Sequence, residues 1–185
     1  VIEMVDLRSA KHVADFTTDG SSGDFLLAIP AGRDYAMYVK ADGYLPHSKN
    51  VSIPKGMDAN DMNLDIVLEP MVAGHRGALH NIFFETNSAS LEQESLPELN
   101  QLYYLLEMHQ DLRLLIEGHT DNTGSTELNA GLSAERAASV RDHLTKRGIK
   151  ADRLEAVGSG ETKPSAPNTS STNRAKNRRT EIKVL

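Results

Sequence analysis

Residues 118–149 read GHTDNTGSTELNAGLSAERAASVRDHLTKRGI, and this stretch decides the fold of the second half of the chain. Its later part carries apolar residues at helical spacing, namely Ala137, Val140 and Leu144. A stripe of this kind predicts a helix with one buried face. Serine commonly begins helices and glycine commonly ends them, so we expect this helix to run from an N-cap at Ser133 to a stop at Gly148.

The segments around this helix predict alternating strands and helices from residue 80 to the C-terminus. The expected strands are residues 82–84, 112–117, 153–157 and 180–184. A first helix should run from Ser95 to Met108, because Ser95 and Glu98 have the spacing of a capping box. The resulting order is β-α-β-α-β-β. Packing both helices on one side of a mixed sheet gives an α/β two-layer sandwich.

The first 72 residues have a different sequence pattern, in which short runs of alternating apolar and polar residues lie between turn residues. In residues 24–30 and 34–41, apolar side chains recur at every second position, the period of a strand with one buried face. The expected strands are residues 1–7, 24–30, 34–41, 50–54 and 63–69. We therefore predict an all-β domain at residues 1–72, a linker at 73–79 and a second domain at 80–185.

Composition excludes several classes of function. The sequence has no cysteine, which rules out disulfides, thiol nucleophiles and cysteine-based metal sites. A formal net charge of −6 argues against a general nucleic-acid binder. No apolar run approaches the length of a membrane span, and residues 1–5 resemble a strand entered midway. We expect a piece of a longer precursor, which would contact a membrane only through a missing N-terminal part.

The polar residues between the predicted elements suit a zwitterionic ligand. Asp121 lies in a loop stiffened by glycines, and Arg136 would fall in the first turn after an N-cap at Ser133. A ligand carboxylate would meet a guanidinium and a helix N-terminus there, while a ligand ammonium would pair with Asp121. Asn129 and Asn87 could add neutral hydrogen bonds. A structural salt bridge between Asp121 and Arg136 is the alternative that spacing alone leaves open.

Five motifs occur in a fixed order: FFETNSASL at 83–91, GHTDNTGS at 118–125, LNAGLSAERAASVRDHLTKRGI at 128–149, RLEAVGSGETKP at 153–164 and NRAKNRR at 173–179. In this order and at these separations they resemble the OmpA-like peptidoglycan-binding domain, the family of the C-terminal parts of OmpA, Pal and MotB. The resemblance covers about residues 80–185.

The resemblance implies non-catalytic binding of peptidoglycan, without metal or cofactor, through the free end of meso-diaminopimelate in an uncrosslinked stem peptide. The residues that it assigns to this ligand are Asp121, Arg136, Asn129, Arg178, Asn87, Thr86, Glu85 and Thr120. Glu85 stands where many members have aspartate. The resemblance also implies a periplasmic protein that ties the outer membrane of a Gram-negative bacterium, or an envelope complex, to the cell wall.

The run TDGSSGDFLLAIPAGRDYAMYVKADGY at residues 18–44 is similar to transthyretin-like and carboxypeptidase-regulatory-like β-sandwiches, whose first strand would be missing here. Such a domain would serve as a spacer or as a second surface for envelope proteins, and a homodimer is left open.

Two other functions remain open at this point. An envelope amidase or peptidase could use His119 and Asp121, although the sequence has neither a nucleophile elbow nor an HExxH motif. A protein–protein module that has lost contact with the wall could use its helices as a dimer or stator interface.

Overall fold

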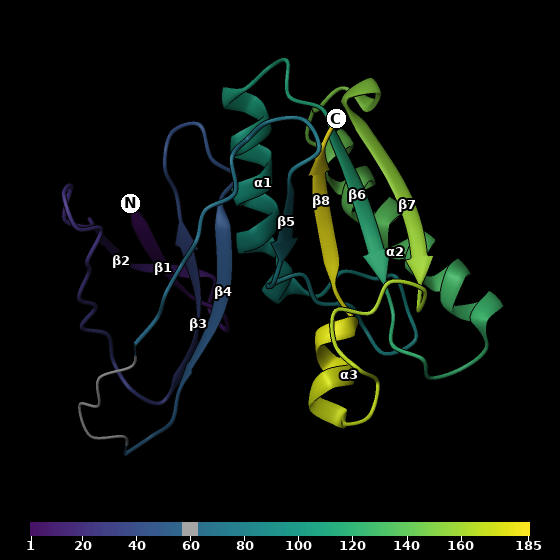
Figure 1. The fold of residues 1–185 in the computed structure, drawn as a ribbon, viewed down its shortest axis with the longest axis horizontal. Coiled ribbons are helices and arrows are strands. Elements are labelled where there is room, and N and C mark those ends of the chain that lie inside the picture. Colours follow the sequence, from purple (N-terminus) through teal and green to yellow (C-terminus); the bar gives the residue numbers. More distant parts are fainter. Residues whose placement is uncertain (57–62) are drawn as a thin grey trace.

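The computed structural model describes residues 1–56 and 63–185 and has two parts, each built on a four-stranded sheet (Figure 1). The N-terminal sheet contains β1 (Ile2–Asp6), β2 (Lys11–Phe16), β3 (Arg33–Val39) and β4 (His47–Ile53). Its order is β2-β1-β3-β4, and all neighbouring strands are antiparallel. The expectation of an all-β first part is therefore confirmed, but its strands differ from those predicted.

Two segments predicted as strands cover one face of this sheet without forming strands. Residues 24–30 and 63–69 alternate between exposed and half-buried positions. Their half-buried side chains pack on the core formed by β1 and β3, and they are Phe25, Leu27, Ile29, Leu64, Ile66 and Leu68. The N-terminal part thus contains one four-stranded sheet with two extended covers, and its described residues form no second sheet. The strand β2 was missed because Lys11–Phe16 has no regular alternation.

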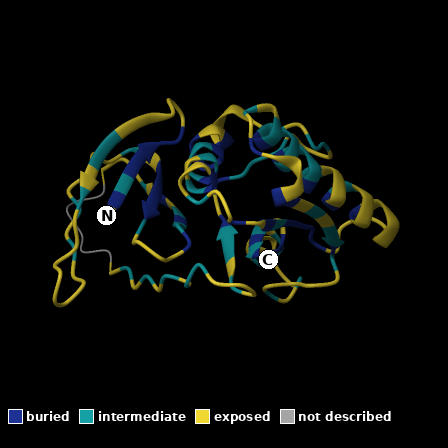
Figure 2. Cartoon of the chain, turned by 90° about the horizontal axis from the view of Figure 1, so that it is seen from above, coloured by how far each residue is buried: buried dark blue, intermediate teal, exposed yellow. Residues whose placement is uncertain are grey.

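The C-terminal part is a mixed α/β domain. Its elements are β5 (Arg76–Leu79), α1 (Leu96–Met108), β6 (Leu114–His119), α2 (Thr126–Lys146), β7 (Leu154–Gly160), α3 (Ser171–Asn177) and β8 (Thr180–Val184), with 3₁₀ turns at Gln93–Ser95 and Ala151–Arg153. The sheet order is β5-β8-β6-β7, in which only the β6–β7 pair is parallel. Helices α1 and α2 turn their buried sides toward one face of this sheet (Figure 2). The mixed α/β architecture is as predicted, whereas α3 is additional.

The first strand of this domain lies earlier than expected. Arg76–Leu79, within the predicted linker, pairs antiparallel with β8. Residues 82–84 form no strand, and only Phe84 makes an isolated bridge, to Leu91. The apolar run at 82–84 has another cause: Ile82 and Phe84 pack on the C-terminal core, while Phe83 packs on the N-terminal sheet.

The two parts join along β4, β5 and α1. His80 N donates to Ser48 Oγ at 3.0 Å, and Leu45 lies in the hydrophobic core of the C-terminal domain. Gln101 Nε2 donates to Glu3 Oε2 at 3.0 Å. These contacts connect the N-terminal sheet directly to the domain that carries the candidate site. None of the described helices has the length and apolar composition needed to cross a bilayer.

The predicted capping box at the start of α1 is wrong. Ser95 Oγ does not cap the helix but donates to Phe83 O at 2.9 Å and accepts from Phe83 N at 2.7 Å. Glu98 accepts a hydrogen bond from Asn81 Nδ2 at 3.0 Å. Both side chains therefore hold the segment before α1, which local spacing could not indicate.

Candidate functional site

Asp121 lies in the loop that follows β6 and is nearly buried. The loop is fixed at its start, because Thr120 N donates to Gly160 O at 2.9 Å. Asp121 Oδ2 accepts from Arg178 Nη1 at 2.6 Å, and Oδ1 accepts from Thr123 N at 2.8 Å. Burial opposes ionisation of Asp121, but the hydrogen bonds from Arg178 and Thr123 outweigh it and lower the pKa. The carboxylate is therefore negatively charged at neutral pH.

The N-cap of helix α2 lies eight residues before the predicted one. Ser125 caps it, and its side chain accepts from Leu128 N at 3.3 Å. Ser133 lies inside the helix, where its Oγ donates to Ala130 O at 3.0 Å and accepts from Gly160 N at 2.9 Å. Arg136 therefore projects from the middle of α2, and the predicted contribution of a helix N-terminus to anion binding is wrong.

Arg136 is half-buried and carries an incompletely paired guanidinium. Its Nε donates to Ser88 O at 3.0 Å, and its Cζ lies 5.0 Å from the centre of the Phe84 ring. Within residues 1–56 and 63–185 it forms no ion pair. Burial lowers the pKa of Arg136, and Arg178 adds to this, while Asp121 opposes it. The guanidinium thus lies near Asp121 and lacks an anion of its own.

Close packing of α2 on the sheet sets the position of Arg136. A Cβ added at Gly118 of β6 would overlap the backbone of Ser133, and one at Gly158 of β7 would overlap the backbone of Ala134. Since only glycine leaves room there, the helix can lie directly against the two parallel strands.

Asn129, which was predicted to contact the ligand, holds parts of the protein itself. Its Nδ2 donates to Asp121 O at 3.2 Å and to Glu161 Oε2 at 2.6 Å. Glu161 was not predicted as a site residue. The one available signal was its place in the motif RLEAVGSGETKP, which says nothing of a partner 32 residues away.

The remaining predicted residues lie on two sides of this centre. Glu85, Thr86 and Asn87 are exposed in a turn closed by Ser88 N donating to Glu85 O at 3.1 Å. Asn87 has a φ of 52°, a left-handed conformation that asparagine tolerates. Thr120 is buried, and its Oγ1 has no hydrogen-bond partner among the described residues. The structure therefore brings together Asp121, Asn129, Arg136 and Arg178, with the turn joined through Ser88.

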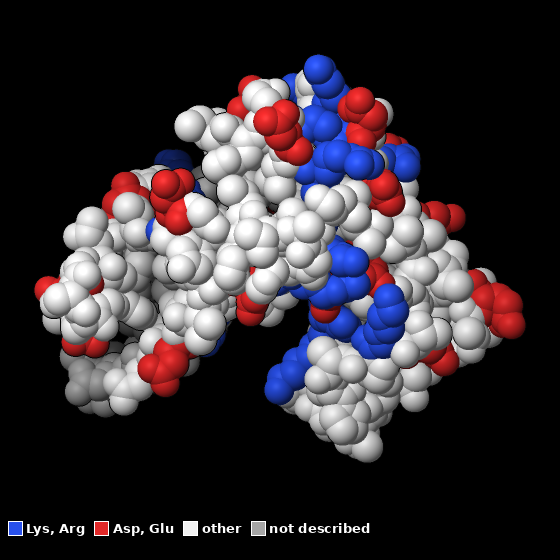
Figure 3. Space-filling model, turned by 45° about the horizontal axis from the view of Figure 1, so that its top comes forward, with Lys and Arg blue, Asp and Glu red and all other residues white. Residues whose placement is uncertain are grey.

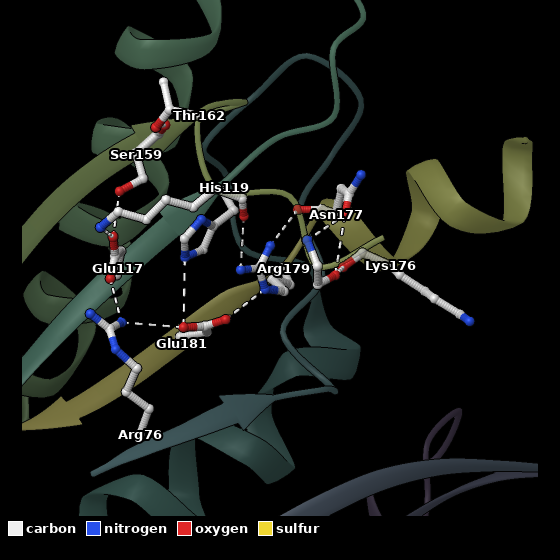
Figure 4. Close-up of polar contacts among 11 residues, drawn as sticks. Arg76, Glu117, His119, Ser159, Thr162, Lys176, Asn177, Arg179 and Glu181 are labelled. Carbon is white, nitrogen blue, oxygen red and sulfur yellow. Dashed lines mark hydrogen bonds and ion pairs between the residues drawn. The ribbon is translucent and has the colours of Figure 1, made fainter. Parts of the chain in front are cut away.

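Arg178 follows α3, which Asn177 anchors. Asn177 Oδ1 accepts from the backbone N of Ser165 and of Ala166, both at 2.9 Å, and its Nδ2 donates to Ala166 O at 2.8 Å. The next residue, Arg179, donates to Glu181 Oε1 at 2.7 Å (Figure 4). The segment on either side of Arg178 is thus held by side chains as well as by backbone.

Charged residues crowd the sheet face that the helices leave open. Glu117 accepts from Arg76 and Lys163, both at 2.5 Å (Figure 4). Burial opposes ionisation of Glu117, but these contacts and one from Ser159 outweigh it and lower its pKa to about 2. Figure 3 shows basic side chains gathered over the C-terminal domain, with acidic side chains lying among them.

His119 belongs to this charged face. Its Nε2 lies 3.9 Å from Glu181 Oε2, and no hydrogen bond or ion pair within the described ranges joins it to Asp121. Glu117, His119 and Glu181 have the geometry of a metal-ligand group. However, Arg76, Lys163 and Arg179 already hold both carboxylates, so a cation would enter a cluster whose charge is balanced.

Comparisons with known proteins agree on one family for the C-terminal domain. The family model described as "OmpA family" matches residues 83–178. The peptidoglycan-binding protein ArfA of Mycobacterium tuberculosis is 44% identical over 103 residues, which is 56% of this chain and 32% of that protein. This chain therefore spans about a third of the length of that relative.

Solved structures give the same result. The peptidoglycan-associated lipoprotein of Burkholderia pseudomallei is 32% identical with a TM-score of 0.53, covering 56% of this chain and 88% of that one. The cell wall anchor of the T6SS from Pseudomonas aeruginosa is 36% identical with a TM-score of 0.50, covering 55% and 73%. The matched family residues begin at 83, so the N-terminal sheet stays unassigned.

Proposed function

The chain belongs to the OmpA family, a non-catalytic family, and on that premise we propose that its C-terminal domain binds peptidoglycan through the meso-diaminopimelate of the stem peptide. The free end of diaminopimelate carries an ammonium and a carboxylate on one carbon. A site that holds the anionic side chain of Asp121 near the cationic side chain of Arg136 matches this pair of charges.

The observation that carries this proposal is the guanidinium of Arg136. It is half-buried, its terminal nitrogens have no anionic partner among the described residues, and burial lowers its pKa. Partial burial of a cation without a counter-ion carries a desolvation cost, and a ligand carboxylate would offset that cost. Arginine also binds carboxylates with two parallel hydrogen bonds, which fixes the orientation of the ligand.

Asp121 would hold the ammonium of the same ligand. Its carboxylate is ionised, and Arg178 and Thr123 fix its direction. Arg178 would stay paired with Asp121. The ligand ammonium would then lie beside Asp121 and the ligand carboxylate beside Arg136, so positive and negative groups would alternate across the site. Asn129 would act by fixing the Asp121 loop, and Asn87, Thr86, Glu85 and Thr120 would form the walls of the cleft.

The biological role that we propose is to anchor an envelope complex to the cell wall, in the periplasm and near the outer membrane of a Gram-negative bacterium. The N-terminal domain would span residues 1–72, and the C-terminal domain would begin at β5 rather than at residue 80. The N-terminal sheet would serve as a spacer or as a contact for envelope proteins. We also propose that this sheet is related to transthyretin-like or carboxypeptidase-regulatory-like domains. A few charge-assisted bonds at a wet cleft give roughly micromolar to millimolar affinity per site, so anchoring relies on many copies.

Sedimentation with purified peptidoglycan sacculi tests this role. Wild-type protein should sediment with diaminopimelate-type sacculi, while Arg136→Gln and Asp121→Asn should remain in the supernatant. The control is Arg113→Gln, because Arg113 is exposed and pairs with Glu155, outside both the site and the groove. Sedimentation of all variants alike would contradict the proposal. If the two variants that fail to sediment also show no cooperative thermal unfolding, Arg136 and Asp121 are needed for folding rather than for binding.

A further inference from the structure

A polar groove opens beside Arg136, between the turn at residues 88–91 and the last turns of α2. It has a volume of about 540 Å3. The polar side chains that line it are Ser88, Ser90, Ser139, Asp142, His143 and Lys146. Ser88 connects the groove to the cleft, because its carbonyl oxygen accepts the Arg136 Nε hydrogen bond at 3.0 Å. Apart from Ser88, none of these residues is assigned to the zwitterion site.

The groove and the cleft follow one helix. Arg136 and His143 are seven positions apart, so they lie on nearly the same side of α2. Lys146 lies ten positions beyond Arg136, which corresponds to about 15 Å along the helix axis. A ligand held at Arg136 that extends along α2 toward its C-terminal end would therefore pass through the groove and end near Lys146.

The ionisable side chains of the groove differ in whether they can pair with a ligand. Asp142 is occupied, because Arg141 donates to its Oδ1 at 2.9 Å from Nε and at 2.8 Å from Nη2. Burial lowers the pKa of His143, with Arg147 and Lys146 adding to the effect, so its ring is neutral at neutral pH. Lys146 is exposed and has no ion-pair partner in the described part of the chain. The groove thus offers one available cation among hydroxyl groups and an imidazole.

From these features we propose that the groove binds the residue next to diaminopimelate in the stem peptide, a γ-linked glutamate, and that Lys146 pairs with its free α-carboxylate. The inference rests on the proposed function. About eleven covalent bonds separate the two carboxylates in the ligand, equivalent to between three and four extended residues, or about 13 Å. Arg136 and Lys146 are about 15 Å apart along the helix axis, and the flexible lysine side chain can reach back over the remaining distance. Ser88 and Ser139 line the groove between them and supply hydroxyl groups for the single γ-glutamyl amide that joins the two ligand residues.

Three synthetic ligands separate the groove from the cleft. They are the tripeptide L-Ala-γ-D-Glu-meso-diaminopimelate, the same peptide with the glutamate α-carboxylate converted to an amide, and free meso-diaminopimelate. Calorimetric titration of the whole chain would use wild type, Lys146→Gln and the control Lys150→Gln. Lys150 is exposed and lies beyond α2, outside the groove lining.

We expect wild type to bind the acid peptide about threefold to fivefold more tightly than the amide, the range of an exposed ion pair. Lys146→Gln should remove this difference and leave the affinity for free diaminopimelate unchanged, while Lys150→Gln should keep it. Equal binding of acid and amide by wild type, or a difference that persists in Lys146→Gln, overturns the inference and leaves the proposed function intact. Binding of none of the three ligands by wild type overturns both.

Discussion

The candidate site contains two kinds of charged residue. Asp121 is already paired, to Arg178 at 2.6 Å, whereas Arg136 has a single hydrogen bond to a carbonyl oxygen. A structural salt bridge would have joined Asp121 and Arg136 to each other. The observed pairing leaves the arginine for an external carboxylate, which distinguishes a binding site from a surface ion pair.

Asn129 tests whether the site depends on residues that do not touch the ligand. In Asn129→Ala the Asp121 loop loses its hydrogen bond to the helix, and Glu161 loses its partner. We expect affinity for the stem peptide to fall about threefold to tenfold and stability to fall by about 1–2 kcal/mol, the cost of a lost buried hydrogen bond. Calorimetry and chemical denaturation measure the two effects.

Asn122→Ala is the matched control, because Asn122 lies in the same loop and is exposed. It should change neither quantity. Unchanged binding in Asn129→Ala would contradict the positioning role. A complete loss of binding at full stability would instead place Asn129 in direct contact with the ligand.

At the scale of single residues, the sequence indicates which charges matter but not how they are partnered. Asp121, Arg136 and Arg178 stand in motifs that a family resemblance can match one by one. The contact between Asn129 and Glu161 forms only after α2 packs beside the end of β7, so no local pattern contains it.

Among the elements, α2 and the parallel strands β6 and β7 form the support of the site. Gly118 and Gly158 allow the helix backbone to lie against the strands, and Ser133 closes the contact by accepting from Gly160 N at 2.9 Å. Any side chain at these two glycines would push the helix, and Arg136 with it, away from the Asp121 loop.

We predict that Gly158→Ala destabilises the protein by about 2–4 kcal/mol, since its Cβ would overlap the helix backbone and neither neighbour can move easily. Gly131→Ala is the control on α2, the helix that packs against Gly158, because a Cβ added at Gly131 meets no atom within 4 Å. It should stabilise the protein by up to about 1 kcal/mol. Thermal and chemical unfolding measure both, and equal effects of the two changes would contradict the packing account.

The errors in the predicted elements have physical causes. Ser133 has the residue type of an N-cap, but Ser125 is also a serine and follows a glycine with a φ of 100°. The helix therefore begins earlier and continues through Ser133, whose hydroxyl bonds back to Ala130 O, as serines inside helices do. Strand β5 is only four residues long and includes a glycine, so its pairing with β8 decides its structure rather than its own pattern.

For the whole molecule, the junction between the two parts holds a buried acid. Glu98 of α1 is 3% exposed and accepts a hydrogen bond from Asn81 Nδ2 at 3.0 Å. Burial raises the pKa of Glu98 to about 7, although polar groups of Ser48, Asn81 and Tyr38 oppose the rise. Ser48 and Tyr38 belong to the N-terminal sheet, so the protonation state of Glu98 acts on the contact between the two parts.

This raised pKa predicts how stability depends on pH. A folded pKa of about 7, against 4.5 for an unperturbed glutamate, means that the folded state holds the proton more tightly. The contribution of Glu98 is fully present below pH 4.5 and is lost as the pH rises through 7. Between pH 5 and pH 8 the free energy of unfolding should fall by roughly 2–3 kcal/mol more in wild type than in Glu98→Gln. Denaturant titrations at the two values measure this, and parallel curves for both proteins would show that Glu98 does not titrate in this range.

The sequence predicted the architecture of the C-terminal domain better than that of the N-terminal part. The C-terminal domain was expected from motifs and from two apolar helix stripes, which specify layers even where individual boundaries are wrong. The N-terminal part was expected to be a sandwich from the resemblance carried by residues 18–44, and residues 24–30 were expected to be a strand because they alternate. Alternation indicates one buried face, however, and does not show whether an extended segment finds a hydrogen-bonded neighbour.

The central claim is that the site of Asp121 and Arg136 holds the zwitterionic end of diaminopimelate. Calorimetric titration with a stem peptide ending in meso-diaminopimelate, against the same peptide ending in lysine, tests it most directly, because lysine lacks the carboxylate that Arg136 would bind. The account predicts binding of the first peptide only, and loss of that binding in Arg136→Gln. Equal binding of both peptides, or binding of neither, would contradict it.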